Sequence, residues 1–411
     1  MTTKNFAIRG DHDPNTLHQF HEVRKDAAYA ALMADGHLGK LMPVGGVAAY
    51  RNSVMVAGVG PDIACGNAAI RTNLKGADFT EADWNGIADL IAETIAFGVG
   101  RTNKANDAPT DHAIFDDWDV WNLVPGKGDR ASLHAKARNQ LGTVGGGNHY
   151  VDVFTDENDN VWVGVHFGSR GLGATIFQGV QALGMNKPWD SRTPEYALNL
   201  KLDSELGHTY WALMHLAGQY AYIGREWVTR KVVSLMGGKE LELVHNHHNF
   251  AWTEEHFGER LIVVRKGATP AWPGQKGFVG GSMGDNAVIL MGETNGDAHE
   301  TQVANLFSTV HGAGRVMGRA EAKKGKVIRD AKGNPTGQRD TSRVVTPEAM
   351  NDWMQTVGVV RRGGDVDESP QVYRRLPEVL TAQGSTVRIL HTLTPRIAVM
   401  AGADVIDPYK D

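Results

Sequence analysis

Five short segments of the sequence carry histidine or cysteine beside glycine, and these residue types could bind metal ions and phosphates. In the first segment, Asp62 and Cys65 lie three residues apart at the end of an apolar run. A carboxylate and a thiolate at this spacing can share a divalent cation, and the sulfur can bridge two cations. A plain turn with a buried cysteine explains the same segment, so its signal is weak on its own.

Three further segments supply imidazoles. His149 closes the glycine-rich run 142–149, His166 ends a strand-like run before 168–171, and His248 belongs to the cluster 245–248. Imidazole is a common ligand of divalent cations, and open glycine backbone can approach a phosphate. The glycine run has neither Walker nor Rossmann spacing. A tight turn, a core histidine and a surface histidine cluster are the competing interpretations of the three segments.

The fifth segment places His311 between residues that leave it sterically open. Glycines follow it at 312 and 314, and Arg315 comes next. An open histidine suits a nucleophile, and an adjacent guanidinium can neutralise a phosphate. The segments 265–269 and 280–284 add Arg, Lys and Ser to open backbone. Together the segments predict a metal-dependent enzyme that acts on phosphate groups, and they leave hydrolysis and group transfer both open.

The elements that must position these residues form a mixed pattern of short strands and long helices. This pattern predicts a mixed α/β or α+β fold, and we take it as α+β, with mixed β-sheets flanked by helices around the residues that could bind metal ions and phosphates. The expected strands are Ser53–Val59, Asn160–His166, Leu261–Val264, Ala287–Met291, Thr386–Leu390 and Arg396–Met400, and the expected long helices are Ile87–Ala96 and Asp203–Met236.

The chemical segments extend from residue 35 to residue 315, so a domain boundary between them would divide the site. We predict one integrated domain over 1–411, with 1–20 as a peripheral arm and 403–411 as a peripheral tail. The basic, polar stretch Lys323–Ser342 is expected to be disordered.

The composition excludes several classes of protein. The chain has 411 residues with 42 Lys plus Arg and 47 Asp plus Glu, and its net charge of −5 excludes a uniformly basic nucleic-acid coat but not a local basic groove. Its 49 glycines lack a collagen period, and its single cysteine excludes an intrachain disulfide. No apolar run approaches the ~18 residues of a membrane helix. We expect a soluble, cytoplasmic protein.

The chemical segments, taken together, resemble the RtcB-type RNA-splicing ligases. The resemblance covers about residues 33 to 402 and rests on Asp35-Gly36-His37-Leu38-Gly39-Lys40, 62–66, 145–149, His166 with 168–171, 248–249, 265–268, 281–284, 311–315 and 367–373. It implies an enzyme that joins an RNA 3′-phosphate or 2′,3′-cyclic phosphate end to a 5′-hydroxyl end, using GTP and two Mn²⁺ ions. A histidine would become guanylylated and pass GMP to the RNA 3′-phosphate before the 5′-hydroxyl displaces it.

The resemblance also implies roles for individual residues. His311 matches the nucleophile, and the implied metal ligands are Asp62, Cys65, His149, His166 and His248, with Cys65 bridging the two ions. The implied nucleotide-binding residues are Asn148, Asp152, Ser282, Gly284, His311, Gly312, Gly314 and Arg315, and the implied RNA or phosphate contacts are Arg170, Arg265 and Lys266. Zn²⁺ would also suit this donor set. We expect a monomer, and the need for an activating protein partner stays open.

Four positions depart from the family pattern. Asp152 stands where a guanine-reading Glu is usual, Ala401 replaces the Lys of a closing Lys-Gly pair, Phe167 replaces a Ser and Pro270 an Arg. These changes gather around base and RNA recognition, which suggests a ligase with altered nucleotide or end preference. Two alternatives remain: a metal-dependent RNA phosphoesterase or cyclic phosphodiesterase that forms no adduct on His311, and a non-catalytic RNA-binding paralogue.

Overall fold

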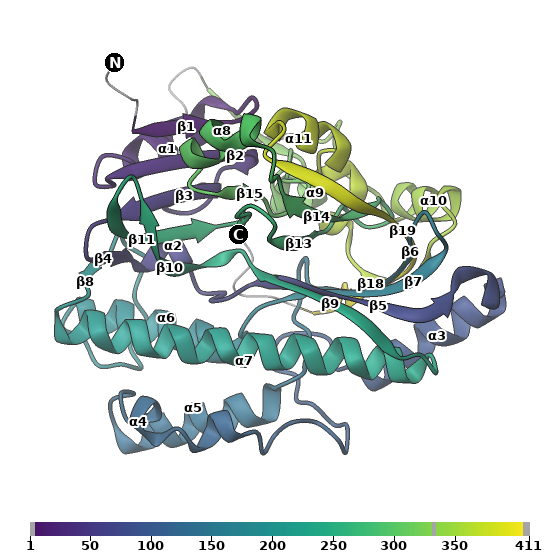
Figure 1. Cartoon of the computed structure of the whole chain (residues 1–411), viewed down its shortest axis with the longest axis horizontal. Helices are drawn as coiled ribbons and strands as arrows, with labels where there is room; N and C mark the ends of the chain where they lie inside the picture. Colours follow the sequence, from purple (N-terminus) through teal and green to yellow (C-terminus); the bar gives the residue numbers. More distant parts are fainter. Residues whose placement is uncertain (1–4, 331–333, 406–411) are drawn as a thin grey trace.

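The larger of two central sheets has eight strands. The computed structural model describes residues 5–330 and 334–405. In this sheet the strands follow the order β13-β14-β19-β6-β7-β5-β9, and β18 pairs in parallel with β19 (Figure 1). Their bounds are Lys276–Val279 (β13), Ala287–Gly292 (β14), Val387–Gly402 (β19), Tyr150–Thr155 (β6), Asn160–Phe167 (β7), Gly66–Lys75 (β5), Glu240–His247 (β9) and Val360–Gly364 (β18).

A second sheet has five strands in the order β1-β2-β3-β11-β10. These are Phe6–Ile8 (β1), Tyr29–His37 (β2), Val44–Tyr50 (β3), Glu259–Lys266 (β11) and Asn249–His256 (β10), and two-stranded pairs are formed by Ala268–Pro270 (β12) with Ser308–Val310 (β15), Ser53–Met55 (β4) with Asn199–Lys201 (β8), and Lys326–Arg329 (β16) with Pro335–Asp340 (β17). The chain passes from the first sheet to the second at His248, the single residue between β9 and β10.

Helices cover the two sheets, and the longest lies along the face of both (Figure 1). The helices are Pro14–Val23 (α1), Val56–Val59 (α2), Glu81–Thr94 (α3), Trp118–Trp121 (α4), Lys127–Gln140 (α5), Arg170–Gly184 (α6), Glu205–Leu235 (α7), His299–Ala304 (α8), Arg319–Lys324 (α9), Pro347–Thr356 (α10) and Leu376–Gln383 (α11). The Ser204 side chain accepts the Gly207 N–H and caps the start of α7. Gly237, at φ +72°, follows the helix end. None of the described helices combines the length and the apolar character needed to span a membrane.

Apolar side chains in the N-terminal and C-terminal halves of α7 join two parts of the core. Leu213 and Tyr220 pack with Phe177 of α6, whereas Val228 and Val232 belong to the cluster beneath β5, β6 and β7. The helix therefore fixes the larger sheet to the rest of the molecule, and Figure 1 shows α4 and α5 as a further layer beyond it.

The structure confirms the α+β class and corrects details of the predicted elements. The prediction for Ser53–Val59 is half wrong, because β4 ends at Met55 and α2 takes up the remainder. The run is buried on all sides, and such a run has no periodicity that separates strand from helix. The two predicted strands after Thr386 are parts of one strand, β19.

Two predicted peripheral or disordered segments also differ. Residues 6–23 form β1 and α1, and Phe20 is buried, so most of the expected arm packs on the five-stranded sheet. The described part of Lys323–Ser342 is ordered as the end of α9 and an antiparallel pair of strands, β16 and β17, whose side chains are mostly exposed and so leave no apolar signal. Residues 406–411 of the expected tail lie outside the described residues.

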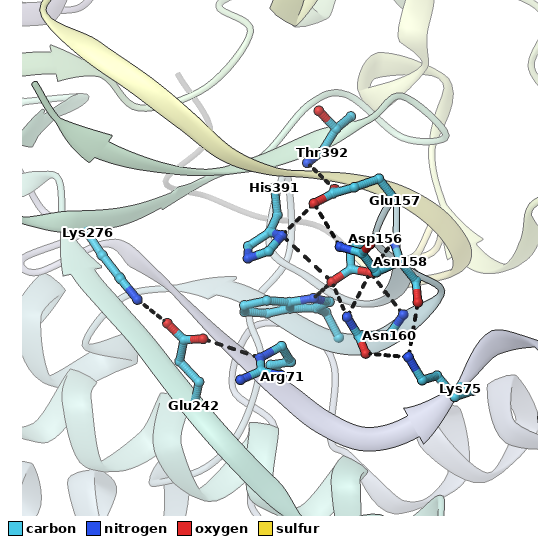
Figure 2. Close-up of polar contacts among 11 residues, drawn as sticks. Arg71, Lys75, Asp156, Glu157, Asn158, Asn160, Glu242, Lys276, His391 and Thr392 are labelled. Carbon is cyan, nitrogen blue, oxygen red and sulfur yellow. Dashed lines mark hydrogen bonds and ion pairs between the residues drawn. The ribbon is translucent and has the colours of Figure 1, made fainter.

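A polar cluster closes the far end of the β6–β7 hairpin (Figure 2). The Asp156 carboxylate accepts the backbone N–H groups of Asn158 and Asn160 and the indole N–H of Trp162. Glu157 pairs with His391 and accepts the Thr392 N–H on β19. The cluster fixes the hairpin to β19, and its residues do not line the cavity described below.

Candidate functional site

A cavity of about 410 Å³ lies where the two sheets meet. It is lined by Asp62, Cys65, His149, His166, His248 and His311, which are the five expected metal ligands and the expected nucleophile. Asn148, Asp152, Ser282, Gly312, Gly314, Arg315, Arg170 and Lys266 line it as well. Of the residues singled out in the sequence, Gly284 and Arg265 do not.

Two groups of ligand-type atoms overlap at Cys65. One group is Cys65, His166 and His248, the other is Asp62, Cys65 and His149, and within each the ligand atoms lie within 4.8 Å of one another. The Cys65 Sγ is 3.2 Å from His166 Nε2 and 3.6 Å from His149 Nε2. The sulfur is thus shared between two groups, which is the arrangement that a bridging thiolate requires.

Close backbone contacts bring these ligands together. Gly66 pairs with Phe167 on one side and with His247 on the other, so β5 joins the strands that end at His166 and His248. A Cβ on Gly66 would lie 2.2 Å from the carbonyl oxygen of Asn246, and one on Gly168 would lie 2.0 Å from the Asp62 carboxylate. Both positions need glycine because any side chain would separate the segments that carry the ligands.

Burial and neighbouring charges set the protonation of the cluster. Burial lowers the pKa of His166 and of His248 well below the usual range, so both rings are neutral and keep a lone pair. Burial, and then the Asp62 carboxylate, raise the pKa of the Cys65 thiol. Although burial opposes it, the partner His149 lowers the pKa of Asp62 to about 2. Three imidazoles, a thiol and a carboxylate within this spacing fit a pair of divalent transition-metal ions.

A buried carboxylate, Asp35 on β2, orients His311. Its Oδ2 lies 2.6 Å from His311 Nδ1 and also accepts the backbone N–H groups of His311, at 2.9 Å, and Gly312, at 3.3 Å. The Nδ1 therefore carries the hydrogen, and the lone pair is on Nε2. The His248 and His311 ring centroids are 4.9 Å apart. Asp35 has no signal of its own in the sequence, where only its place in the family-like string 35–40 marks it.

Arg315 lines the cavity in a fixed position. Its guanidinium donates to the Tyr373 hydroxyl at 2.9 Å and to the Asp367 carbonyl at 2.8 Å, and it lies 3.5 Å from the Glu368 carboxylate. Glu368 also pairs with Arg319, a second cation at the cavity wall. The structure thus adds two residues, Glu368 and Tyr373, whose role is to hold Arg315.

Three other predicted polar residues reach the cavity from loops and strand ends. The Ser282 hydroxyl donates to Asp285, which is itself held by Arg375 at 2.6 Å. Arg170, at φ +57°, donates to the Gly98 carbonyl and the Thr143 hydroxyl. Lys266 is buried against the Ala57 carbonyl at 3.4 Å. The cavity therefore has cations on several sides.

Two of the expected site residues, Arg265 and Gly284, lie outside the cavity lining. Arg265 is fully buried, forms a bidentate ion pair with Glu254 at 2.7 and 3.0 Å, and donates to Ser308, so it has no surface for RNA. Arg265 and Lys266 are neighbours on β11, and neighbouring side chains of a strand point to opposite faces. Gly284 packs instead against α10, where its Cβ would meet Met354.

Asp152 lies at a cavity wall that Tyr150, Met283, Ala398 and Met400 also form. The Asp152 residue is 8 % exposed, and its Oδ1 has no hydrogen-bond partner among the described residues. Burial raises the pKa of this carboxyl well above its usual value. A buried carboxyl group that has one oxygen without a partner and lies beside apolar side chains is suited to reading the polar edge of a flat ring.

Comparisons with known proteins identify the family to which the whole chain is similar. A sequence model of the family described as tRNA-splicing ligase RtcB matches residues 17–401. The RNA-splicing ligase RtcB of Escherichia coli K12 is 29 % identical over 395 residues, which is 90 % of each chain. The tRNA-splicing ligase RtcB of Thermococcus kodakarensis is 30 % identical over 367 residues, covering 72 % of this chain and 74 % of the relative. That of Nanoarchaeum equitans is 29 % identical over 444 residues, covering 90 % and 85 %.

Proposed function

This chain belongs to the tRNA-splicing ligase RtcB family, and from that premise we propose that it is an RNA ligase dependent on GTP and Mn²⁺. Its substrates are RNA ends that carry a 3′-phosphate or a 2′,3′-cyclic phosphate and ends that carry a 5′-hydroxyl. The reaction proceeds through a covalent adduct of GMP on His311.

The observation that carries this proposal is the place of His311. Asp35 holds its Nδ1–H, so the Nε2 lone pair is available, and the overlapping groups around Cys65 line the same cavity. A histidine fixed in this tautomer is a competent nucleophile at neutral pH.

The covalent steps follow from this nucleophile. The Nε2 attacks the α-phosphorus of GTP, so that a P–N bond forms and pyrophosphate leaves. An oxygen of the RNA 3′-phosphate then attacks the same phosphorus, the P–N bond breaks, and the RNA end carries GMP through a pyrophosphate link. The 5′-hydroxyl attacks the RNA phosphate, loses its proton and expels GMP. A cyclic phosphate is first hydrolysed to the 3′-phosphate.

The other residues of the cavity bind and neutralise phosphate groups. Divalent ions held by Asp62, Cys65, His149, His166 and His248 would supply Lewis-acid stabilisation of the phosphate charge. Arg315, fixed by Tyr373, faces the phosphates next to His311. Asn148, Ser282, Gly312 and Gly314 contribute polar groups and open backbone, and Arg170 and Lys266 add positive charge for the RNA.

Asp152 supports a second proposal, that the base preference of this ligase is altered. A carboxylate accepts from both N–H groups of the guanine edge, whereas a protonated carboxyl has one donor and one acceptor. Since Asp152 is short and buried and its Oδ1 has no partner among the described residues, the protonated form matches the adenine edge, which also has one donor and one acceptor. The proposal is therefore that this ligase uses GTP less strictly than the family pattern implies.

The test is nucleotide labelling. The protein, with Mn²⁺ and α-labelled GTP or ATP, is compared with His311→Ala. We expect a His311-dependent adduct that is labile in acid and stable in alkali, as a phosphoramidate is. If neither GTP nor ATP labels metal-loaded protein, the proposal is refuted and the phosphoesterase, which hydrolyses a cyclic phosphate without an adduct, is favoured. Binding of RNA without turnover of any end would favour the non-catalytic paralogue.

The adduct also separates the nucleotide preferences. Labelling by GTP alone, at rates unaffected by ATP, would refute the altered base preference and leave the ligase mechanism standing. RNA joining is then measured with a 3′-phosphate strand and a 5′-hydroxyl strand.

We propose further that the enzyme works as a cytoplasmic monomer. Sizing of the purified protein tests the monomer, and multiple turnover without added protein would show that no activating partner is needed.

A further inference from the structure

Arg225, in the middle of α7, is a fully buried cation outside the cavity. Among the described residues it forms no ion pair with a carboxylate within 4.0 Å. Its guanidinium instead donates four hydrogen bonds. Nη1 donates to the carbonyl oxygens of Ala64, at 2.9 Å, and Phe167, at 2.6 Å. Nη2 donates to His247 Nδ1, and Nε donates to His245 Nε2, both at 2.8 Å.

Three of these acceptors are each next in sequence to one expected metal ligand. Ala64 precedes Cys65, Phe167 follows His166, and His247 precedes His248. The ligands Cys65, His166 and His248 are one of the two groups with ligand atoms within 4.8 Å. One guanidinium therefore contacts all three chain segments of that group, one residue away from each ligand.

The chemistry of the guanidinium makes this contact rigid. Its N–H groups lie in one plane with fixed directions, and it can only donate. Both imidazole nitrogens that face it must therefore be unprotonated acceptors. Burial lowers the pKa of Arg225 to about 10, so the group stays charged at neutral pH. A buried cation without a carboxylate partner is costly, which argues for a role beyond filling space.

The Ala64 segment shows why such a contact is needed. Ala64 has φ +60°, a conformation that a residue with a Cβ rarely adopts. Its carbonyl is turned to Arg225, and the next residue presents its sulfur to the cavity. The guanidinium therefore donates to a carbonyl oxygen of this strained turn and helps to hold the turn in place.

We propose that Arg225 is a positioning residue that preassembles Cys65, His166 and His248 for a divalent cation. The inference rests on the metal site of the proposed function. Preassembly raises the affinity for the ion because the three segments need no ordering when it binds.

The test compares Arg225→Lys with Arg230→Lys. Lysine keeps the buried charge but offers a single nitrogen, which cannot reach all four acceptors. Arg230 lies on the same helix, is half exposed and pairs with Glu226 and Glu240, so its replacement controls for changes in α7. Mn²⁺ affinity is measured in a titration in which the electron paramagnetic resonance spectrum reports the concentration of free Mn²⁺. Folding is checked by circular dichroism. The Mn²⁺ dependence of His311 labelling is measured beside them.

We expect Arg225→Lys to bind Mn²⁺ at least tenfold more weakly and Arg230→Lys to bind it as the wild type does. At saturating Mn²⁺, labelling by Arg225→Lys should recover, because the ligands themselves are intact. A folded Arg225→Lys protein with Mn²⁺ affinity within twofold of the wild type would overturn this inference but leave the proposed function standing. A wild-type protein that binds no Mn²⁺ would overturn the proposed metal site, and this inference with it.

A second pair of variants keeps the inference testable if Arg225→Lys does not fold. His245 accepts from Arg225 and is not adjacent to a ligand of this group. His245→Gln keeps an acceptor, whereas His245→Leu removes it. We expect threefold or greater weakening of Mn²⁺ binding in His245→Leu and a near wild-type affinity in His245→Gln. Equal affinities in the two proteins, whatever their melting temperatures, would overturn the inference.

Discussion

Replacing Asp35 by Asn should slow the formation of the His311 adduct without removing the site. Asp35 is fully buried, and its Oδ2 accepts three N–H groups, one from the His311 ring and two from the backbone of His311 and Gly312. The two backbone donors require an oxygen at this position, so the new amide has its oxygen there and the ring keeps its tautomer. The variant thus removes charge and little else.

The size of the effect follows from the loss of that charge. When Nε2 bonds to phosphorus, the ring becomes cationic, and its Nδ1–H lies 2.6 Å from the carboxylate. A hydrogen bond to a charged group contributes about 1.5–3 kcal/mol and one between neutral groups about 0.5–1.5 kcal/mol. The resulting difference of about 1–1.5 kcal/mol in the barrier corresponds to a rate ~5- to 13-fold lower.

The assay is a single-turnover labelling rate at saturating GTP and Mn²⁺. The rate should fall, while the GTP concentration for half-maximal labelling stays near that of the wild type. Glu254→Gln is the matched control, because it neutralises another buried carboxylate that lies outside the cavity lining. A wild-type rate in Asp35→Asn, or an equal loss in Glu254→Gln, would refute the role given to Asp35.

Three further predictions concern stability. Mn²⁺ at a hundred times its dissociation constant should stabilise the wild type by about 2.7 kcal/mol, seen as a higher melting temperature, and Cys65→Ala should lose most of this gain; an undiminished gain would contradict the bridging role. Because burial raises the pKa of Asp152, the folded protein keeps a proton that the unfolded chain has lost, so its stability falls as the pH rises from about 4. Asp152→Asn should therefore melt higher than the wild type at pH 7–8 in the metal-free state, and the two should converge near pH 4; a constant difference would exclude this cause. Arg265→Met should cost about 3–5 kcal/mol of stability in denaturant unfolding, because it removes the bidentate cation partner of the buried Glu254 and leaves that carboxylate only His256, while His311 labelling per folded molecule stays unchanged; a selective loss of RNA joining would restore Arg265 as an RNA contact.

Much of the site could be predicted from the sequence because its residues lie in short segments, and the residue types in each segment indicate which ligands they can bind. Metal chemistry is indicated by the spacing of Asp62 and Cys65, and phosphate chemistry by the glycines around His311. Neither inference requires knowledge of the fold. The α+β class followed from the short apolar runs and the long amphipathic helix that became α7. Continuous apolar stretches, such as the one divided between β4 and α2, could not be assigned, since a buried segment has no exposed face to give it a period.

The partners that make these residues act were decided by the tertiary structure alone. Asp35 and His311 are 276 positions apart, and Arg225 is 161 positions from Ala64. No local pattern couples such positions, because hydrogen bonds between them depend on strand pairing and helix packing. Arg265 shows the same limit. Beside Lys266 in a glycine-bordered segment it carried the same signal as Arg170, and only the face of β11 on which it stands separates a buried ion pair from a cavity wall.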